Sequence, residues 1–558
     1  MRTSFAIAFV ALAACGGAQT TGTQSPGGGS GSGSAKPGAP GDDMLEIAVD
    51  VKGVQLEPEA LGRPGVVKVD PKGQKAPPTD KKLDAQIAKQ RDAMTKAKDP
   101  VEKQAYAALL ATSLWRKSNE ASGADKNAAL ADARQALRDV AQVVGAKVDP
   151  TTLQMLGSYE LMVDPPDWGA AEKAFAEFVA KSPKDPQEPY YRAWWTLCLL
   201  RQYKNDEALD VVKAVSPSEK QPELAYAMAW AKWRKGDGAG AWQAILAASK
   251  GWGNLANREV VDRDTLLIAA RGGVPWTDAF AKIGPMFGKA AENQYAMLFK
   301  LGDGLSFAGR WADAVAAFEK ALDIIGAKAP ATEVTTLRYR EADFTVRLDN
   351  PAESARFGKL ALDALAKCGA KCTPADALTV VKAVFQIGKV FHVLYASAHD
   401  DRFYQPALDL YLAAIGLMGN APQDDKDEAV KTMNQLQSTK KMVDKGRSEK
   451  KDDPGNHDAK YVGALLQYHN QEVQACYEAQ LAGDPKLAGT LTLNLESDET
   501  GVIKGKSTEP KAGLAGVAAV GQCVETRASA WKLPTKAKKG ATRIKIVYTL
   551  AKRPGKTP

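Results

Sequence analysis

Three features of this sequence could do chemistry: its six cysteines, its four histidines and the triplet Gly505-Lys506-Ser507. The triplet has the end of the phosphate-binding P-loop pattern, but Thr500 stands where that pattern needs its first glycine. It also lies in a predicted hairpin rather than between a strand and a helix. The sequence has no H-E-x-x-H pair, no zinc-spaced cysteine set and no G-x-S-x-G elbow. It therefore predicts no catalytic, cofactor-binding or metal site, and we expect a protein that is not an enzyme.

Cys15 is the cysteine with the most informative surroundings. It follows ten apolar residues, Phe5 to Ala14. A membrane-spanning helix needs about 20 residues, so this run is too short to span, but it fits a secretory signal. Leu12-Ala13-Ala14-Cys15 resembles the lipobox of bacterial lipoproteins, which implies that residues 1–14 are a signal peptide and that acylated Cys15 anchors the protein to a membrane. The alternative is ordinary signal cleavage after Ala14 or Ala18, with Cys15 incidental.

The segment after Cys15 is too polar to fold. Residues 16–43 are dominated by Gly, Ser, Thr and Pro, as in "SPGGGSGSGSAKPGAPG". Such a composition buries too little apolar surface to offset the entropy of ordering. We expect residues 15–80 to be a lipid anchor with a flexible tether, the alternative being an inert spacer. Gly16, rather than Asp, implies outer-membrane sorting by resemblance to known lipoproteins, with the protein facing the periplasm.

The charge balance limits the kinds of partner. A formal net charge of +8, from 74 basic and 66 acidic residues, is modest for 558 residues. We do not expect an exported protein to bind nucleic acid, so any basic patch should face acidic protein, peptidoglycan or lipid head groups.

Residues 81–445 predict paired helices, because apolar residues recur at helical spacing between short segments with Gly, Pro or Asp. "LFKLGDGLSFAGRWADAVAAFEKAL" resembles a tetratricopeptide repeat, with Leu301-Gly302, Trp311 and Phe318 at signature positions. Small residues should let two helices approach, while Trp311 and Phe318 fill the gap to the next pair. The resemblance implies a solenoid whose concave face binds proteins or peptides. "LGSYELMVDPPDWGAAEKAFAEFVAKSP" is a second copy, and weaker copies centre on Ala133, Ala208, Ala241, Ala355 and Ala407.

Aromatic residues and cysteines within this region allow further predictions. The aromatics of "EPYYRAWW" and "AYAMAWAKW" could line a groove for a partner, but their helical spacing favours core between repeats. Cys198, in "WWTLCLL", is predicted to be a buried free thiol. Cys368 and Cys372 flank a turn with Gly369, and no histidine lies within nineteen residues of them. A structural metal would want four ligands, so a disulfide is the better prediction for this pair.

After a charged linker at 446–458, residues 459–552 change periodicity. A helix from Val462 to Tyr477 precedes the strand "LAGTLTLNLES", in which Leu491, Leu493 and Leu495 alternate with polar residues. The strand "GVIKGKST" follows, then a helix that should end at Leu533-Pro534. "ATRIKIVYTL" is a last strand. The predicted fold class is therefore mostly α, a helical-repeat solenoid followed by a small α+β domain of helix, strand, strand, helix and strand.

These C-terminal segments resemble the AgmX/PglI C-terminal domain, which is similar in fold to the C-terminal domain of TonB energy transducers. That family occurs in envelope and gliding-motility proteins. TonB-type domains typically join a transmembrane segment, whereas this one follows repeats, so the resemblance implies a binding module. The matching elements are Cys476-Tyr477-Glu478, Pro485 with Gly489, Gly501-Val502, Cys523-Val524 and the ending from Trp531 to Pro534.

Two site predictions follow for this domain. One cysteine on each helix indicates a disulfide between Cys476 and Cys523, the alternative being two buried free thiols. A three-stranded sheet has two edges, and we expect the last strand to form one that accepts a partner's strand. Arg543 and Lys545 should point away from the core and select an acidic partner, or else only keep the edge from aggregating. The expected partner-binding residues are Arg543, Ile544, Lys545, Ile546 and Tyr548.

The sequence as a whole predicts a non-enzymatic envelope lipoprotein. We expect it to hold other envelope proteins together through the repeat groove and the C-terminal sheet edge, in an envelope-spanning complex such as one for gliding motility or transport. One alternative is an enzyme with an unrecognised site in the helical region. Another is a passive structural lipoprotein.

Overall fold

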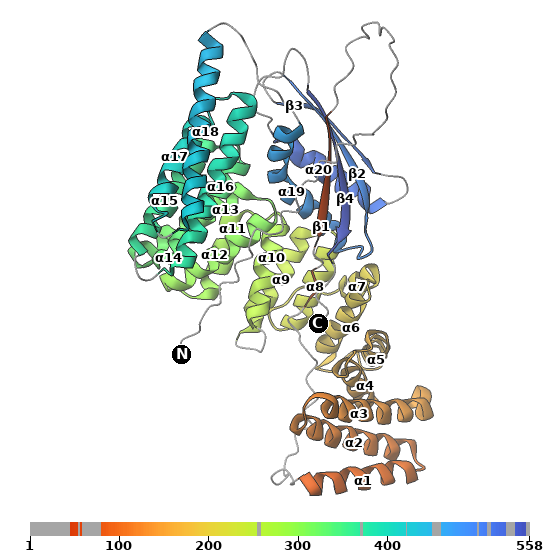
Figure 1. The fold of residues 1–558 in the computed structure, drawn as a ribbon. Coiled ribbons are helices and arrows are strands. Elements are labelled where there is room, and N and C mark those ends of the chain that lie inside the picture. Colours follow the sequence, from red (N-terminus) through yellow and green to blue (C-terminus); the bar gives the residue numbers. More distant parts are fainter. Residues whose placement is uncertain are drawn as a thin grey trace, which may run out of the picture. The chain divides into compact units, whose positions relative to one another are not determined.

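The computed structural model describes residues 45–53, 56–58, 80–253, 258–368, 372–419, 421–448, 459–498, 502–510, 515–531 and 542–553. The predicted signal, Cys15 and residues 449–458 of the predicted linker lie outside these residues. The chain divides into unit 1, Met1–Gln55 with Lys289–Pro558, and unit 2, Leu56–Gly288. As the sequence predicts, the described chain is mostly helical, with one small mixed sheet in unit 1 (Figure 1).

Unit 2 consists of helices with short connections. Neighbouring helices pack in pairs such as α2 with α3, α4 with α5 and α8 with α9. Asp99 and Asp149 are the N-caps of α2 and α4, and each precedes a proline in the first turn, which explains where these helices begin. The helices are α1 (Asp80–Lys96), α2 (Pro100–Glu120), α3 (Gly123–Val144), α4 (Pro150–Met162), α5 (Trp168–Lys181), α6 (Glu188–Arg201), α7 (Asn205–Val212), α8 (Pro222–Arg234), α9 (Gly238–Trp252), α10 (Arg258–Arg271) and α11 (Trp276–Phe287).

Unit 1 contains the remaining helices and the sheet. The helices before the sheet are α12 (Ala291–Phe307), α13 (Trp311–Ile325), α14 (Ala331–Arg347), α15 (Pro351–Cys368), α16 (Pro374–Ala398), α17 (Tyr404–Gly416) and α18 (Gln423–Ser448). Two more, α19 (Ala459–Leu481) and α20 (Ala515–Ala528), accompany the strands. The strands are β1 (Leu45–Gly53), β2 (Gly489–Ser497), β3 (Ile503–Pro510) and β4 (Thr542–Lys552).

Close approach of paired helices depends on the glycines that the sequence singles out. A Cβ added at Gly302 would stand 2.2 Å from Cε1 of Phe318, and one at Gly157 would stand 2.4 Å from Cε1 of Phe175. Phe318 therefore fills the space within its own pair, α12 with α13. It also stacks on Phe344 of α14, with ring centroids 6.0 Å apart, which is the contact with the next pair that the sequence predicts.

The predicted core positions of the helical region are buried. The cysteine Cys198 is a buried free thiol, and burial raises its pKa. Trp194, Tyr226 and Trp230 are buried as well, which favours core over groove for these aromatics. The five alanines on which the sequence predicts that weaker repeat copies centre are also buried: Ala133, Ala208, Ala241, Ala355 and Ala407.

The sheet contains a strand that the sequence analysis missed. The strand order is β1-β4-β2-β3, with β2 antiparallel to β3 and β4 and with β1 parallel to β4. Helix α19 packs against β1, while α20 packs against β2 and β3. The predicted order of helix, strand, strand, helix and strand is confirmed for residues 459–552, although α20 ends before Trp531. Strand β1 comes instead from residues 45–53, far away in the sequence (Figure 1).

The tether predicted for residues 15–80 is therefore wrong for part of its length. Residues 45–53 form β1, and residues 56–58 are held within unit 2. There, the Glu57 carboxylate lies 2.7 Å from Arg234 Nη2 and accepts a hydrogen bond from the Tyr203 hydroxyl (2.8 Å). The Arg234 side chain is fully buried, so Glu57 supplies the counter-charge that a buried guanidinium needs.

One hydrophobic core runs through the helices α14 to α18 and the sheet domain of unit 1. It includes Phe385 of α16, Val473 of α19 and Ile546 of β4. Among the described residues, Pro374–Ala396 within α16 is long and apolar enough to cross a membrane, with a mean hydropathy of 1.5. In this protein α16 packs against α14, α17 and α19 and contributes to that core.

Candidate functional site at the C-terminal sheet

The side chains of β4 alternate as the sequence predicts. Ile544, Ile546 and Tyr548 are buried against the helices. Arg543 is exposed and Lys545 is half-buried on the opposite face of the sheet. Arg543 Nε lies 3.8 Å from Glu496 Oε2 on the neighbouring strand β2, so part of the charge on this face is already balanced.

The prediction that β4 is a free edge strand is wrong. Strand β4 pairs with β2 on one side and with β1 on the other, and the register places Val49 beside Tyr548 and Val51 beside Leu550. The backbone groups that Arg543, Ile544, Lys545, Ile546 and Tyr548 were expected to offer a partner therefore face the chain's own strands. A count of strands within residues 459–552 could not include this fourth strand.

Strand β1 is held by both its backbone and its close fit to α19. Val51 is buried, and a Cβ added at Gly53 would stand 2.7 Å from the ring of Tyr477. Tyr477 is itself fixed, because its hydroxyl donates to the carbonyl oxygen of Leu487 (2.6 Å). The sequence signal for β1 was present in "LEIAVDVKG", which alternates apolar and polar residues as a half-buried strand does.

The opposite edge of the sheet, β3, is protected. The backbone N–H of Thr508 points away from β2 and donates to the Glu525 carboxylate on α20 (2.7 Å). Pro510, at the end of the strand, has no N–H to offer. Capped donors and proline are devices that discourage further strand pairing.

Both predicted disulfides are present. Cys476 and Cys523 join α19 to α20, and Cys368 and Cys372 join the end of α15 to the residue that precedes Thr373, the N-cap of α16. The first bond ties together the two helices that cover the sheet. The two helices of the candidate site are therefore cross-linked to each other.

A buried carboxylate connects the sheet domain to the helical pair α12 and α13. Glu472 on α19 is 9% exposed and accepts hydrogen bonds from the indole N–H of Trp531 (2.6 Å) and of Trp311 (3.1 Å). The His469 ring stacks on Trp531, with centroids 4.3 Å apart, and its Nδ1 lies 3.7 Å from Glu472 Oε2.

These contacts set the charge state of Glu472. Burial by itself would raise the pKa of this carboxyl, but His469 and the two indole N–H groups favour the charged form and lower the pKa overall. Glu472 is therefore a buried carboxylate whose partners come from both parts of unit 1. Sequence reasoning did not find it, because its partners are 59 and 161 residues away.

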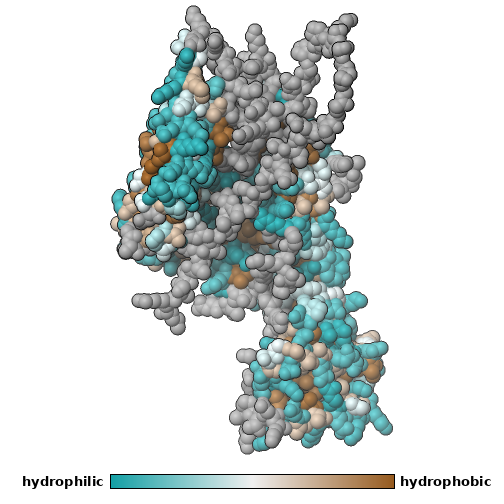
Figure 2. Space-filling model, in the orientation of Figure 1, coloured by the Kyte–Doolittle hydropathy of each residue, from teal (hydrophilic) through white to brown (hydrophobic). Residues whose placement is uncertain are grey.

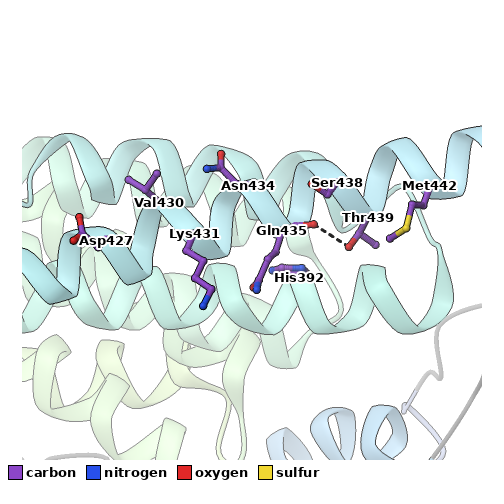
Figure 3. Close-up of a pocket in the computed structure, with 9 residues that line it drawn as sticks. All are labelled: His392, Asp427, Val430, Lys431, Asn434, Gln435, Ser438, Thr439 and Met442. Atoms are coloured by element: carbon purple, nitrogen blue, oxygen red, sulfur yellow. Dashed lines mark hydrogen bonds between the residues drawn. The ribbon is translucent and has the colours of Figure 1, made fainter.

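Two open grooves lie on the helical part of unit 1. The larger, with a volume of about 830 Å³, runs along α18, whose Asn434, Ser438 and Met442 line it opposite His392 of α16 (Figure 3). His392 Nδ1 lies 3.2 Å from the Tyr411 hydroxyl, and burial lowers its pKa. This side of unit 1 is mainly hydrophilic with small hydrophobic patches (Figure 2). The second groove, about 470 Å³, lies between α15 and α17.

Two carboxyl groups whose pKa is raised by burial, Glu341 and Asp303, lie outside both grooves. Burial raises the pKa of Glu341 to about 8, although Arg338 lowers it, and Arg338 Nη1 donates to Glu341 Oε2 (2.7 Å). Burial likewise raises the pKa of Asp303, which pairs with Arg340. Each of these carboxyl groups thus forms an ion pair with an arginine of the packed helices.

The described residues contain no cluster of three or more His, Cys, Asp or Glu side chains that could hold a metal ion. No protein-family model matches the chain, and no curated protein matches its sequence.

Proposed function

We propose that this protein is a non-enzymatic lipoprotein of the cell envelope, anchored through Cys15, that holds other proteins together. In this proposal the helix pairs are tetratricopeptide-like repeats, and residues 459–552 form an AgmX/PglI-type, TonB-like module. Its setting would be an envelope-spanning complex, for example in gliding motility or transport, with the lipoprotein itself at the outer membrane and facing the periplasm.

The observation that carries this proposal is the continuous core of unit 1. Helices α14 to α18 and the sheet domain bury residues in one cluster, and Glu472 of the sheet domain accepts hydrogen bonds from Trp531 and from Trp311 of α13. Such a body presents helical grooves and strand edges in a fixed arrangement. Rigid display of separate surfaces suits a scaffold that positions partners.

The chemistry of the described residues supports binding rather than catalysis. The single histidine of the α18 groove is hydrogen-bonded to Tyr411, and the groove is open along the helix. Glu341 and Asp303, whose proton affinities are raised, are held by arginines and do not line it. An acid or base in catalysis must instead reach a substrate.

Membrane fractionation combined with capture of envelope proteins tests the proposal. The Cys15→Ala variant should leave the membrane fraction while still folding, as checked by circular dichroism. Wild-type protein cross-linked in cells should capture a reproducible set of envelope proteins, and disruption of the α18 groove by Asn434→Trp should reduce part of that set. A variant that fractionates like wild type would contradict the anchor, and the absence of any reproducible partner would contradict the scaffold.

A further inference from the structure

Strand β1 has an inner and an outer edge, and one hydrogen bond distinguishes them. The backbone N–H of Arg553 donates to the carbonyl oxygen of Gly53 (2.9 Å), so Gly53 faces β4. The N–H and C=O of one strand residue point to the same side, and those of the next point to the other. Val51 and Val49 therefore also face β4, whereas Ala48 and Asp50 direct their backbone groups outward.

The outer edge of β1 has no neighbouring strand within the described chain. Ala48 and Asp50 are exposed, and their outward N–H and C=O groups have no hydrogen-bond partner among the described residues. Strand β1 also has no proline and no bulge in its pairing with β4. It thus lacks the protection that Glu525 and Pro510 give to β3, and an unpaired edge is a template for another strand.

We propose that this edge pairs in antiparallel fashion with the same edge of a second copy of the chain. The two four-stranded sheets would then form one continuous sheet across a two-fold axis. Hydrogen bonding in an antiparallel ladder needs outward-directed residues opposite one another. With Val49 on the axis, the nine residues of β1 overlap completely, and Ala48 lies opposite Asp50 of the second copy.

The charges on β1 select this register. It places Glu46 opposite Lys52 of the second copy, and the symmetry forms this pair of opposite charges twice. A shift by two residues one way places Glu46 opposite Asp50, and a shift the other way places Asp50 opposite Asp50. Both shifts oppose like charges, which destabilise a strand pair. Complete overlap and favourable charge therefore coincide in a single register.

The apolar side of β1 agrees with the same register. Val49 would lie opposite Val49 of the second copy, and position 51 opposite position 47, so apolar residues of β1 lie opposite apolar residues. This inference goes beyond the proposed function, since it needs neither lipid at Cys15 nor an envelope partner.

Sedimentation equilibrium of the full chain with Cys15→Ala, which carries no lipid, is the first test. The apparent mass should rise with concentration from one chain toward two. Lys52→Glu should weaken dimerisation about tenfold or more, because two opposite-charge pairs become like-charge pairs. Adding Glu46→Lys in the same chain should restore the dimer, since the charges are then exchanged.

Disulfide trapping tests the register and does not depend on the charge variants. In the pairing proposed, residue 49 is a non-hydrogen-bonded pair with Cα atoms about 4.5 Å apart, so Val49→Cys should cross-link two chains on mild oxidation. Ala48→Cys is the matched control: it is more exposed, but its copies lie on a diagonal about 7–8 Å apart and should cross-link less.

Three results would overturn the proposal. A chain that stays monomeric up to its solubility limit has no such interface. A dimer that persists unchanged in Lys52→Glu uses another surface. Stronger cross-linking of the Ala48→Cys variant than of the Val49→Cys variant would show random collision instead of the stated register.

Discussion

Replacing Glu472 with glutamine should destabilise unit 1 substantially. The carboxylate offers two acceptor oxygens to two indole N–H donors, Trp531 at 2.6 Å and Trp311 at 3.1 Å, in a buried site. A glutamine keeps one acceptor and turns its NH2 group toward the other donor. The variant therefore loses one hydrogen bond to a charged group and leaves a buried donor without an acceptor.

The magnitude follows from these two losses. Hydrogen bonds to charged groups contribute about 1.5–3 kcal/mol, and a buried unsatisfied donor costs about 1–3 kcal/mol. Because the two terms overlap, we expect the free energy of unfolding to fall by about 2–4 kcal/mol. Urea denaturation followed by circular dichroism measures this change.

A double-mutant cycle and a surface control make the test specific. Trp311→Phe should be destabilising by itself but less so in the Glu472→Gln background, since the donor is then already without an acceptor. Glu496→Gln, on a carboxylate that is 44% exposed and 3.8 Å from Arg543, should change stability by less than about 1 kcal/mol. The reasoning is refuted if Glu472→Gln is as mild as Glu496→Gln.

Three further predictions concern other parts of the structure. Because burial raises the pKa of Glu341 to about 8 from an ordinary value of 4.5, its contribution to the free energy of unfolding is complete below pH 4.5 and is lost as the pH rises toward 8. Glu341→Gln should therefore reduce the fall in urea midpoint between pH 5 and pH 8. An unchanged fall in this variant would be contrary evidence. Removing the Cys476–Cys523 bond, which spans 47 residues, should lower the free energy of unfolding by about 4 kcal/mol on the chain-entropy model. Removing the Cys368–Cys372 bond, which spans 4 residues, should lower it by about 2 kcal/mol. Equal losses of stability in denaturation would contradict that ranking. Gly302→Ala should lower the free energy of unfolding by about 1–3 kcal/mol, because the added methyl group clashes with Phe318. Gly416→Ala, which has open space around it, should not lower it. Similar melting temperatures of the two variants would disprove the close approach of α12 and α13.

Local sequence patterns predicted much of unit 1. The alternation of Leu491, Leu493 and Leu495 identified β2, and the glycine at Gly302 identified the close approach of two helices, because both are properties of neighbouring residues. The cysteine pairs were predictable because each pair joins segments that the sequence already assigned to one turn or to one small domain.

The errors concern contacts between distant segments. Apolar and polar residues alternate along β1, but nothing near residues 45–53 indicates that its partner strand is β4, almost 500 residues later. The polar composition of residues 16–43 made the whole segment to residue 80 look like tether. Likewise, Glu472 resembles any helical carboxylate until Trp311 and Trp531 are placed beside it.

The central structural claim is that the N-terminal strand completes the C-terminal sheet, and residue-resolved hydrogen exchange tests it most directly. The hydrogen bond from Arg553 to Gly53 implies that the N–H groups of Lys545, Val547 and Thr549 face β1, while those of Ile546 and Tyr548 face β2. In the wild-type chain both sets should be protected. Replacing residues 45–53 with a Gly/Ser sequence should expose Lys545, Val547 and Thr549 and leave Ile546 and Tyr548 protected. Fast exchange of Lys545, Val547 and Thr549 in the wild type, or no change in the variant, would contradict the claim.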